Sequence, residues 1–252
     1  MYSTDKTEKW FDSYVDGFRK DGRLLPLQEL KRKHSRRVMA LACAIAESLE
    51  WNEENDAWFA HAAGLLHDTA RFSQCRDFGT FSDSASFDHG DRGAEILDAE
   101  FDWEGIADAD RKKLLTAVRC HNKIEIPSNM PLSTYRWCAL VRDADKIDVY
   151  RLMQRRIEEG NISEVLPRHG KAAKLSPRLV AEVRERGRGS YENALSLQDF
   201  RLVQLTWALD LNYPVSAVTL REEGVFDKIA EELKGFGIDD VVEALMKKIN
   251  GM

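Results

Sequence analysis

Several histidines and aspartates of this chain fall on helix faces that are otherwise apolar. A buried imidazole or carboxylate without a partner is costly, so each must find a hydrogen bond, a counter-charge or a metal ion. A single such histidine is usually satisfied by a backbone carbonyl. A divalent cation could satisfy several of these groups at once, and His/Asp ligation suits Mn, Fe, Co, Ni or Zn. The groups in question are His34, His67, Asp68, His89, His121 and Asp145.

Helices are predicted to carry all of these residues. Residues 27–51 repeat apolar side chains at spacings of three and four, with His34 one turn before Val38 on the apolar face. Runs of alternating apolar and polar residues, which would predict strands, are missing from the sequence, so we expect an all-α fold. The other helices of this part are predicted over residues 52–68, 88–101, 108–121 and 132–157.

Small residues and two loops are expected to surround the site. The stretch AAGLL directly precedes His67, which favours close packing between helices at this point. Residues 69–88 are rich in Ser, Asp, Phe and Gly and are predicted to form an ordered loop, as are residues 122–131. Loops of this length are often functional.

The chain changes character after about Arg156, where it becomes polar, locally basic and interrupted by Gly and Pro. Ser176 and Pro177 predict a helix start, with a capping hydroxyl and a proline in the first turn. We therefore expect a core over residues 1–156 and a helical extension packed on it over residues 157–252. Further helices are predicted over residues 196–213, 215–224, 225–235 and 238–251.

Composition narrows the class of protein. The net charge of -6 argues against a binder of nucleic-acid polymers or of membrane surfaces. The charged N-terminus lacks the apolar core of a signal peptide, and no run approaches the ~18 apolar residues of a membrane span. We expect a cytoplasmic protein with reduced thiols. A homodimer is a possible oligomeric state. The scattered cysteines are Cys43, Cys75, Cys120 and Cys138.

The order of these ligand candidates resembles the H…HD…D pattern of the HD-domain superfamily of metal-dependent phosphohydrolases. His34 lies in HSRRVMALACAIA, His67 and Asp68 in AAGLLHDTARF, and Asp145 in RDADKID. The stretches GTFSDSASFDHGDRGAEIL and CHNKIEIP resemble a subgroup of uncharacterised predicted HD hydrolases that carries two extra histidines. The resemblance covers roughly residues 28–153.

This resemblance implies an all-α HD-domain helical bundle with the metal held between helices. His34, His67, Asp68 and Asp145 would hold the first ion. Asp143 competes with Asp145 for the last place, because periodicity hardly separates the two, and the ADK context favours Asp145.

The two extra histidines imply either a second ion or a substrate pocket. In binuclear relatives the positions of His89 and His121 ligate a second ion that the paired aspartate bridges. In mononuclear relatives such histidines line the pocket. The implied cofactor is therefore one or two divalent ions, with Mn, Fe, Co, Ni, Zn and Mg all open.

Phosphoester hydrolysis is the activity that the resemblance implies. The metal would lower the pKa of a bound water and polarise the phosphoryl oxygen, with Asp68 bridging two ions or orienting the water. Arg71 could hold a phosphate through its planar guanidinium, with a surface salt bridge as the alternative. Lys146 could neutralise an anionic group, and Lys123 and Asn122 are further candidates for contacting the substrate.

One departure from better-known relatives bears on the substrate. HD enzymes that hydrolyse guanosine polyphosphates, and some nucleotidases, carry an acid shortly after the His-Asp pair, whereas residues 69–74 read TARFSQ. Asp83 and Asp88 could supply an acid, although Asp88 equally suits a cap for the helix that starts near His89. His61 is expected to face away from the site, and His169 is expected to be exposed in a loop.

We therefore expect a phosphohydrolase that acts on a small phosphorylated metabolite or nucleotide. Two alternatives remain open. Some HD-fold proteins with six ligands bind two irons and use oxygen to cleave C–C or C–P bonds, and the six residues could fill all six places. A non-catalytic metal or nucleotide sensor is the second alternative.

Overall fold

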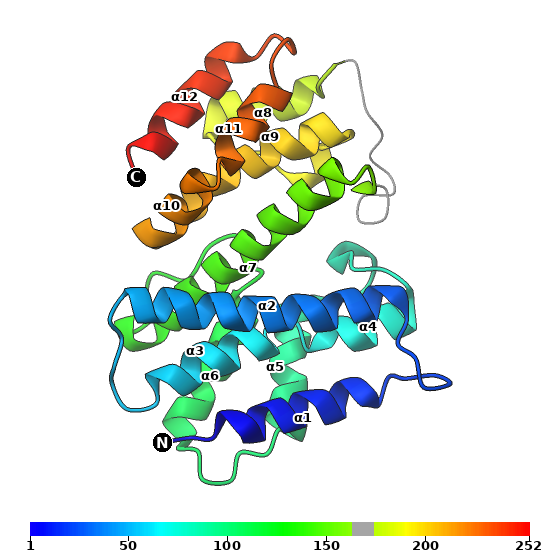
Figure 1. Cartoon of the computed structure of the whole chain (residues 1–252), viewed down its shortest axis with the longest axis vertical. Helices are drawn as coiled ribbons and strands as arrows, with labels where there is room; N and C mark the ends of the chain where they lie inside the picture. Colours follow the sequence, from blue (N-terminus) through cyan, green and yellow to red (C-terminus); the bar gives the residue numbers. More distant parts are fainter. Residues whose placement is uncertain (163–173) are drawn as a thin grey trace. The chain divides into compact units, whose positions relative to one another are not determined.

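The computed structural model of the chain describes residues 1–162 and 174–252 (Figure 1). They form two compact units, Met1–Asp148 and Val149–Met252, and the boundary falls inside helix α7 (Leu132–Glu158). Within the described residues all regular structure is helical, apart from one isolated bridge between Lys20 and Arg23. The predicted all-α fold is confirmed.

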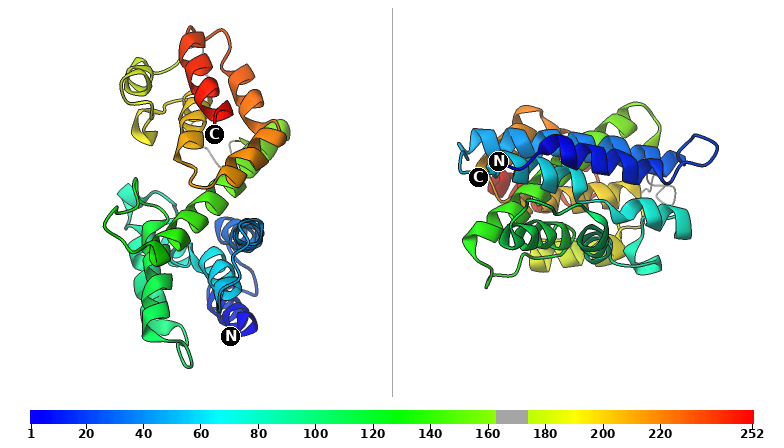
Figure 2. Two further views of the ribbon diagram at one scale, coloured as in Figure 1. Left: turned by 90° about the vertical axis from the view of Figure 1, so that its left-hand side faces the viewer. Right: turned by 90° about the horizontal axis from the view of Figure 1, so that it is seen from below.

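The first unit is built around helix α3, which packs against α1, α2 and α6 (Figures 1 and 2). Ten of the eleven residues of α3 are buried, as expected for a short central helix made of Ala, Leu, Gly and aromatic residues. Its C-terminal end therefore lies in the interior of the unit. The helices of this unit before α7 are α1 (Thr4–Asp16), α2 (Pro26–Ser48), α3 (Asp56–Leu66), α4 (Ala70–Phe78), α5 (His89–Glu100) and α6 (Asp108–Cys120).

Gly64 allows α2 and α3 to approach each other closely. A Cβ atom built on Gly64 would lie 2.6 Å from Cα of Met39 and 2.9 Å from the carbonyl oxygen of Val38. Both atoms belong to the backbone of α2, so neither can move aside as a side chain could. The close packing that the small residues before His67 predict is confirmed at this point.

Replacing Gly64 by alanine is expected to lower the free energy of unfolding by about 1–3 kcal/mol, since the two helix backbones must separate. Urea-induced unfolding followed by circular dichroism measures this change. Gly251→Ala is the matched control, because its Cβ would meet no atom closer than 3.5 Å. Equal stabilities of the two variants would show that the close approach is not required.

The prediction of one loop over residues 69–88 is wrong in its first half. Helix α4 occupies Ala70–Phe78 and buries Phe72 and Cys75, and Gly79 ends it with a φ of 64°. Glycine adopts this left-handed conformation at a helix end with the least strain. The second half holds a short 3-10 helix, η1 (Asp83–Ala85). Helix α1 was not predicted, although its buried Phe11 and Val15 have helical spacing.

The second unit is a smaller helical assembly in which α9 packs against α11, and α11 also packs against α10 and α12. Ser176 caps α8, its hydroxyl accepting a hydrogen bond from the Leu179 amide, which confirms the predicted helix start. Its elements are α8 (Pro177–Arg186), η3 (Tyr191–Asn193), α9 (Leu197–Trp207), η4 (Ala208–Asp210), α10 (Pro214–Glu222), α11 (Val225–Glu232) and α12 (Asp239–Asn250).

None of the described helices combines the length and the apolarity that crossing a bilayer requires.

Candidate metal centre

Helix ends bring most of the six ligand candidates together in the first unit. His67 is the C-cap of α3 and His121 is the C-cap of α6, and Asp68 follows in the turn that leads to α4. The C-terminal end of a helix carries partial negative charge, so two such ends favour a cation. His34 lies within α2, His89 is the first residue of α5, and Asp145 lies within α7.

The first ligand group consists of His34, His67, Asp68 and Asp145. Nε2 of His34 lies 3.2 Å from Nε2 of His67, and each of these atoms is 3.3 Å from Oδ2 of Asp68. Oδ1 of Asp145 lies 3.1 Å from Nε2 of His34 and 3.8 Å from Nε2 of His67. Ligands about 2.1 Å from one ion are about 3–3.5 Å apart, so this spacing fits a single divalent cation.

The second ligand group shares Asp68 with the first. Nε2 of His89 lies 3.0 Å from Nε2 of His121, and these atoms are 3.6 and 3.7 Å from Oδ1 of Asp68. One oxygen of this carboxylate therefore faces each group. The arrangement fits a carboxylate that bridges two ions.

Two of the four imidazoles are fixed by backbone carbonyls. Nδ1 of His67 lies 2.9 Å from the carbonyl oxygen of Gly64, and Nδ1 of His121 lies 2.6 Å from that of Val118. Because a carbonyl can only accept, Nδ1 carries the hydrogen in both rings. In the neutral form of either ring, the Nε2 lone pair therefore faces the cluster, as a metal ligand requires.

The other two imidazoles are held by carboxylates. Nδ1 of His34 lies 2.7 Å from Oδ2 of Asp148, whose Oδ1 accepts a hydrogen bond from Nε of Arg37 at 2.6 Å. Nδ1 of His89 lies 2.5 Å from Oδ2 of Asp83. Burial raises the pKa of both carboxyl groups, but hydrogen bonds, above all those with the histidines, lower it overall and keep them ionised.

Replacing Asp148 by asparagine is expected to weaken metal binding by about 10–100-fold, because the orientation and basicity of His34 depend on this carboxylate. Isothermal titration with Mn²⁺ measures the change. Asp98→Asn provides the control, since Asp98 is an exposed aspartate that pairs with Arg111 away from the cluster. A dissociation constant for Asp148→Asn within twofold of the control would refute the orienting role.

Burial favours the neutral form of two of the four imidazoles, His67 and His89. Burial lowers the pKa of His67, and it lowers the pKa of His89 to about 4. Burial also opposes a charge on His34, but hydrogen bonds with Asp145, Asp148 and Asp68 outweigh it and raise the pKa of this imidazole to about 10. A cation that binds Nε2 of His34 must therefore displace a proton.

The cluster reaches solvent at Asp145. The side chain of this residue is 26% exposed, whereas the five other ligand candidates are buried. An ion held here can keep a coordination position open toward a substrate, which distinguishes catalytic from structural metal sites.

Arg71 is a partly buried neighbour of the cluster. Its Nε lies 3.4 Å from Oδ1 of Asp68, and its Nη1 donates to Oδ1 of Asp83 at 2.9 Å and to the carbonyl oxygen of Phe81 at 2.6 Å. The side chain is 13% exposed, so it is not a surface salt bridge. A role in phosphate binding stays a prediction.

Asn122 and Lys123 bind the N-terminal end of α5. Nδ2 of Asn122 donates to Oδ1 of Asp88 at 2.9 Å, and Nζ of Lys123 lies 2.6 Å from Oδ2 of the same residue and 2.8 Å from Asp91. Asp88 itself accepts from the Gly90 amide, which confirms the predicted cap of α5. Substrate contacts of both residues stay predictions, and would require these bonds to rearrange.

Lys146 follows Asp145 on α7 and is half-buried. Asp143 is buried, and among the described residues the groups that could hold a metal include Asp145 and not Asp143.

His61 pairs with Glu8 of α1 at 3.0 Å, which confirms that it faces away from the cluster. His169 lies outside the described residues.

Three residues beside the cluster were missed from the sequence. Lys31 lies 2.5 Å from Oδ2 of Asp68, and Arg37 and Asp148 together hold His34. Each of them lies three positions from a ligand candidate, His34 or Asp145, on the same helix face. That spacing is the signal that could have identified them.

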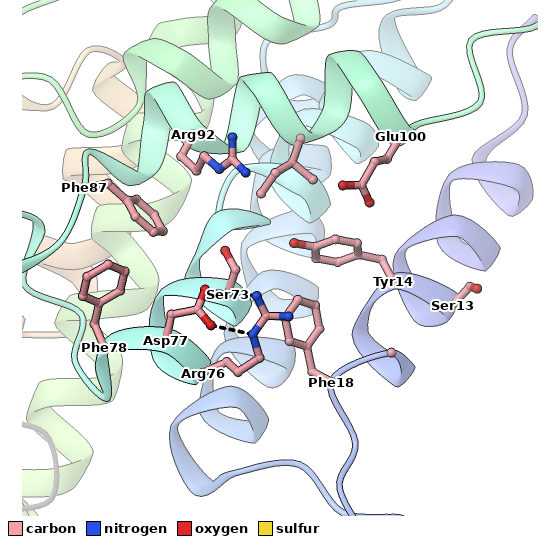
Figure 3. A pocket seen from close by; sticks show the side chains of 12 residues that line it. Ser13, Tyr14, Phe18, Ser73, Arg76, Asp77, Phe78, Phe87, Arg92 and Glu100 are labelled. Carbon is pink, nitrogen blue, oxygen red and sulfur yellow. Dashed lines mark hydrogen bonds and ion pairs between the residues drawn. The ribbon is translucent and has the colours of Figure 1, made fainter.

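A cavity of about 630 Å³ lies elsewhere on the first unit, between α1, α4 and α5 (Figure 3). Phe78 and Phe87 form one wall with their ring centroids 5.7 Å apart, and Arg76 pairs with Asp77 inside it. None of the six ligand candidates lines this cavity. It is therefore a separate feature from the metal centre.

Comparison with known proteins agrees with the geometry of the cluster. Residues 32–153 match the family model of the HD domain, and this segment contains all six ligand candidates. A search of curated proteins and a search of solved structures each gave no match. Residues 32–153, which carry the H…HD…D residues on α2, at the end of α3 and on α7, therefore match the HD domain family.

Proposed function

We propose that the chain is a metal-dependent phosphohydrolase that hydrolyses a phosphoester of a small phosphorylated metabolite or nucleotide. The observation that supports this most strongly is the placement of Asp68, whose two oxygens face two separate groups of histidine Nε2 atoms. His34, His67, Asp68 and Asp145 would hold one ion. Asp68, His89 and His121 would hold a second.

Divalent ions at these ligands would supply Lewis acidity, which activates water and polarises a phosphoryl oxygen. Asp68 would keep the two positions at a fixed separation and orient the attacking water. The partly exposed Asp145 marks the side from which a substrate would enter. Arg71 and Lys146 would neutralise charge on the phosphoryl group, with Asn122 and Lys123 contributing further substrate contacts.

The acidic residues near the His-Asp pair do not replace the acid that is missing from residues 69–74. Asp83 is bound to His89 and Arg71, and Asp88 caps α5. These engagements support a substrate other than the guanosine polyphosphates. The phosphoester of a small metabolite or nucleotide is therefore the substrate class that we favour over guanosine polyphosphates.

A panel of phosphomonoesters and nucleotides, assayed with added Mn²⁺ or Co²⁺, tests this function. Release of inorganic phosphate that stops on chelation and returns on readdition of metal is the expected result. His67→Ala should lose both metal and activity. A wild-type protein with full metal occupancy and no hydrolysis of any member of the panel would contradict the proposal.

The bridging position of Asp68 also fits a di-iron oxygenase that cleaves a C–C or C–P bond, since six ligands are available for two irons. That alternative predicts nearly two irons per chain in the protein as isolated, together with oxygen consumption on a substrate. Ligand-dependent stabilisation without any turnover would identify a non-catalytic metal or nucleotide sensor instead.

A further inference from the structure

The ammonium group of Lys31 contacts the carboxylate of Asp68, which the two ligand groups share. Its Nζ lies 2.5 Å from Oδ2 of Asp68, and its side chain is 16% exposed. It belongs to α2, one turn before His34, so the two side chains share a helix face. None of the ligand roles proposed above uses Lys31.

The position of this ammonium group conflicts with a cation at the same oxygen. Oδ2 of Asp68 is also the oxygen that lies 3.3 Å from Nε2 of both His34 and His67, where the first ion would bind. A dication and an ammonium group would repel each other there, in surroundings where water screens charge only weakly. An additional anion would offset this repulsion and let both positive charges occupy the region.

A second cationic side chain, that of Arg71, lies near Oδ1, the other oxygen of Asp68. Nε of Arg71 lies 3.4 Å from Oδ1, and Cζ of Arg71 and Nζ of Lys31 lie 5.5 and 5.4 Å from the centroid of the Phe81 ring. The guanidinium is anchored by Asp83 and by the Phe81 carbonyl. Lys31, with its flexible four-carbon stem, is the cation that can turn toward a ligand.

We propose that Lys31 competes with the first ion for Oδ2 of Asp68 and binds the phosphoryl group of the substrate. This inference rests on the proposed function and narrows its substrate class to phosphomonoesters. The terminal phosphate of a monoester is a dianion with three unesterified oxygens, enough to contact the ions, Lys31 and Arg71 together. A phosphodiester carries one negative charge and two such oxygens.

The test uses the full chain and two probes, Mn²⁺ alone and inorganic phosphate added to the Mn²⁺-loaded protein, both followed by isothermal titration. Lys31→Gln is expected to bind Mn²⁺ several-fold more tightly, because a competitor is gone. Its dissociation constant for phosphate should rise about tenfold or more, the usual loss for one hydrogen bond to a charged group. Lys31→Arg should restore most of the phosphate affinity.

Lys33→Gln is the matched control, since Lys33 is an exposed lysine of the same helix that pairs with Glu29. It should leave both dissociation constants unchanged. Lys31→Met, which keeps the aliphatic stem, repeats the test if the glutamine variant is misfolded by circular dichroism. Phosphate affinity of Lys31→Gln within twofold of wild type would overturn the inference, as would an unchanged affinity for Mn²⁺.

The inference and the proposed function can fail separately. If the wild-type protein binds phosphate through Lys31 and yet hydrolyses no phosphoester, the proposed function fails and the phosphate site stands. If phosphoesters are hydrolysed and Lys31→Gln keeps the wild-type KM, the hydrolase stands and the role of Lys31 is refuted.

Discussion

Replacing Asp68 by asparagine is expected to remove both bound ions and to slow phosphoester hydrolysis by about 1,000-fold or more, because Lewis acidity contributes several kcal/mol to such reactions. Asparagine keeps the shape of the side chain and loses its charge. Oδ2 and Oδ1 of Asp68 face the two ligand groups, so this single change affects both. It also leaves Lys31 and Arg71 without the carboxylate that both contact.

Initial rates and Mn²⁺ titration of the Asp68→Asn protein check this result. His89→Ala is the informative comparison, because it should lose the second ion and retain the first. His61→Ala is the control, since His61 belongs to the same helix as His67 and binds Glu8 instead of the cluster. An Asp68→Asn protein that retains two ions and wild-type rates would refute the bridging role.

Metal binding is expected to raise the midpoint of thermal unfolding by about 5–10 °C. An ion that binds only the folded protein stabilises it by about 2.7 kcal/mol at a free concentration of 100 times Kd, and about 2–4 °C follow from each kcal/mol. The reason is local: imidazole Nε2 atoms of His34 and His67 face each other at 3.2 Å. A cation between them would be ligated by both atoms and would take the place of the proton on His34.

Scanning calorimetry of the chelator-treated protein, with and without Mn²⁺, measures the shift. The shift should be clearly smaller in His67→Ala, which loses the first ion, and persist in full in His61→Ala. An equal shift in all three proteins would locate the stabilising ion outside the cluster.

Periodicity in the sequence was sufficient to predict the helices that carry the site. The predicted span 108–121 corresponds to α6 (Asp108–Cys120), and 132–157 corresponds to α7 (Leu132–Glu158). Helix α6 has one apolar face, which the sequence displays directly, whereas α7 is buried on every side over residues 137–144. Helix α4 was missed because Ser, Arg and Gln interrupt its short apolar pattern, and because only its packing in the fold reveals that Phe72 and Cys75 are buried.

The site was predictable in its residue types and less so in its supporting contacts. His67 and Asp68 are adjacent in sequence, and the structure places them where the pattern predicts, at the end of α3. The carboxylates that hold His34 and His89 were not assigned, because Asp148 is 114 positions from His34 and Asp83 lies in the short 3-10 helix η1, where the sequence shows no periodicity. The pairing of Asp148 with His34 depends on tertiary structure, although its three-residue spacing from Asp145 places both aspartates on one helix face.

Anomalous diffraction from crystals of the Mn²⁺-loaded protein tests the metal centre most directly. Two peaks are predicted on either side of Asp68, each about 2–2.3 Å from its ligands. One should lie among His34, His67 and Asp145, and the other beside His89 and His121. A map without a peak at these residues, from protein that is active toward phosphoesters, would contradict the proposed metal centre.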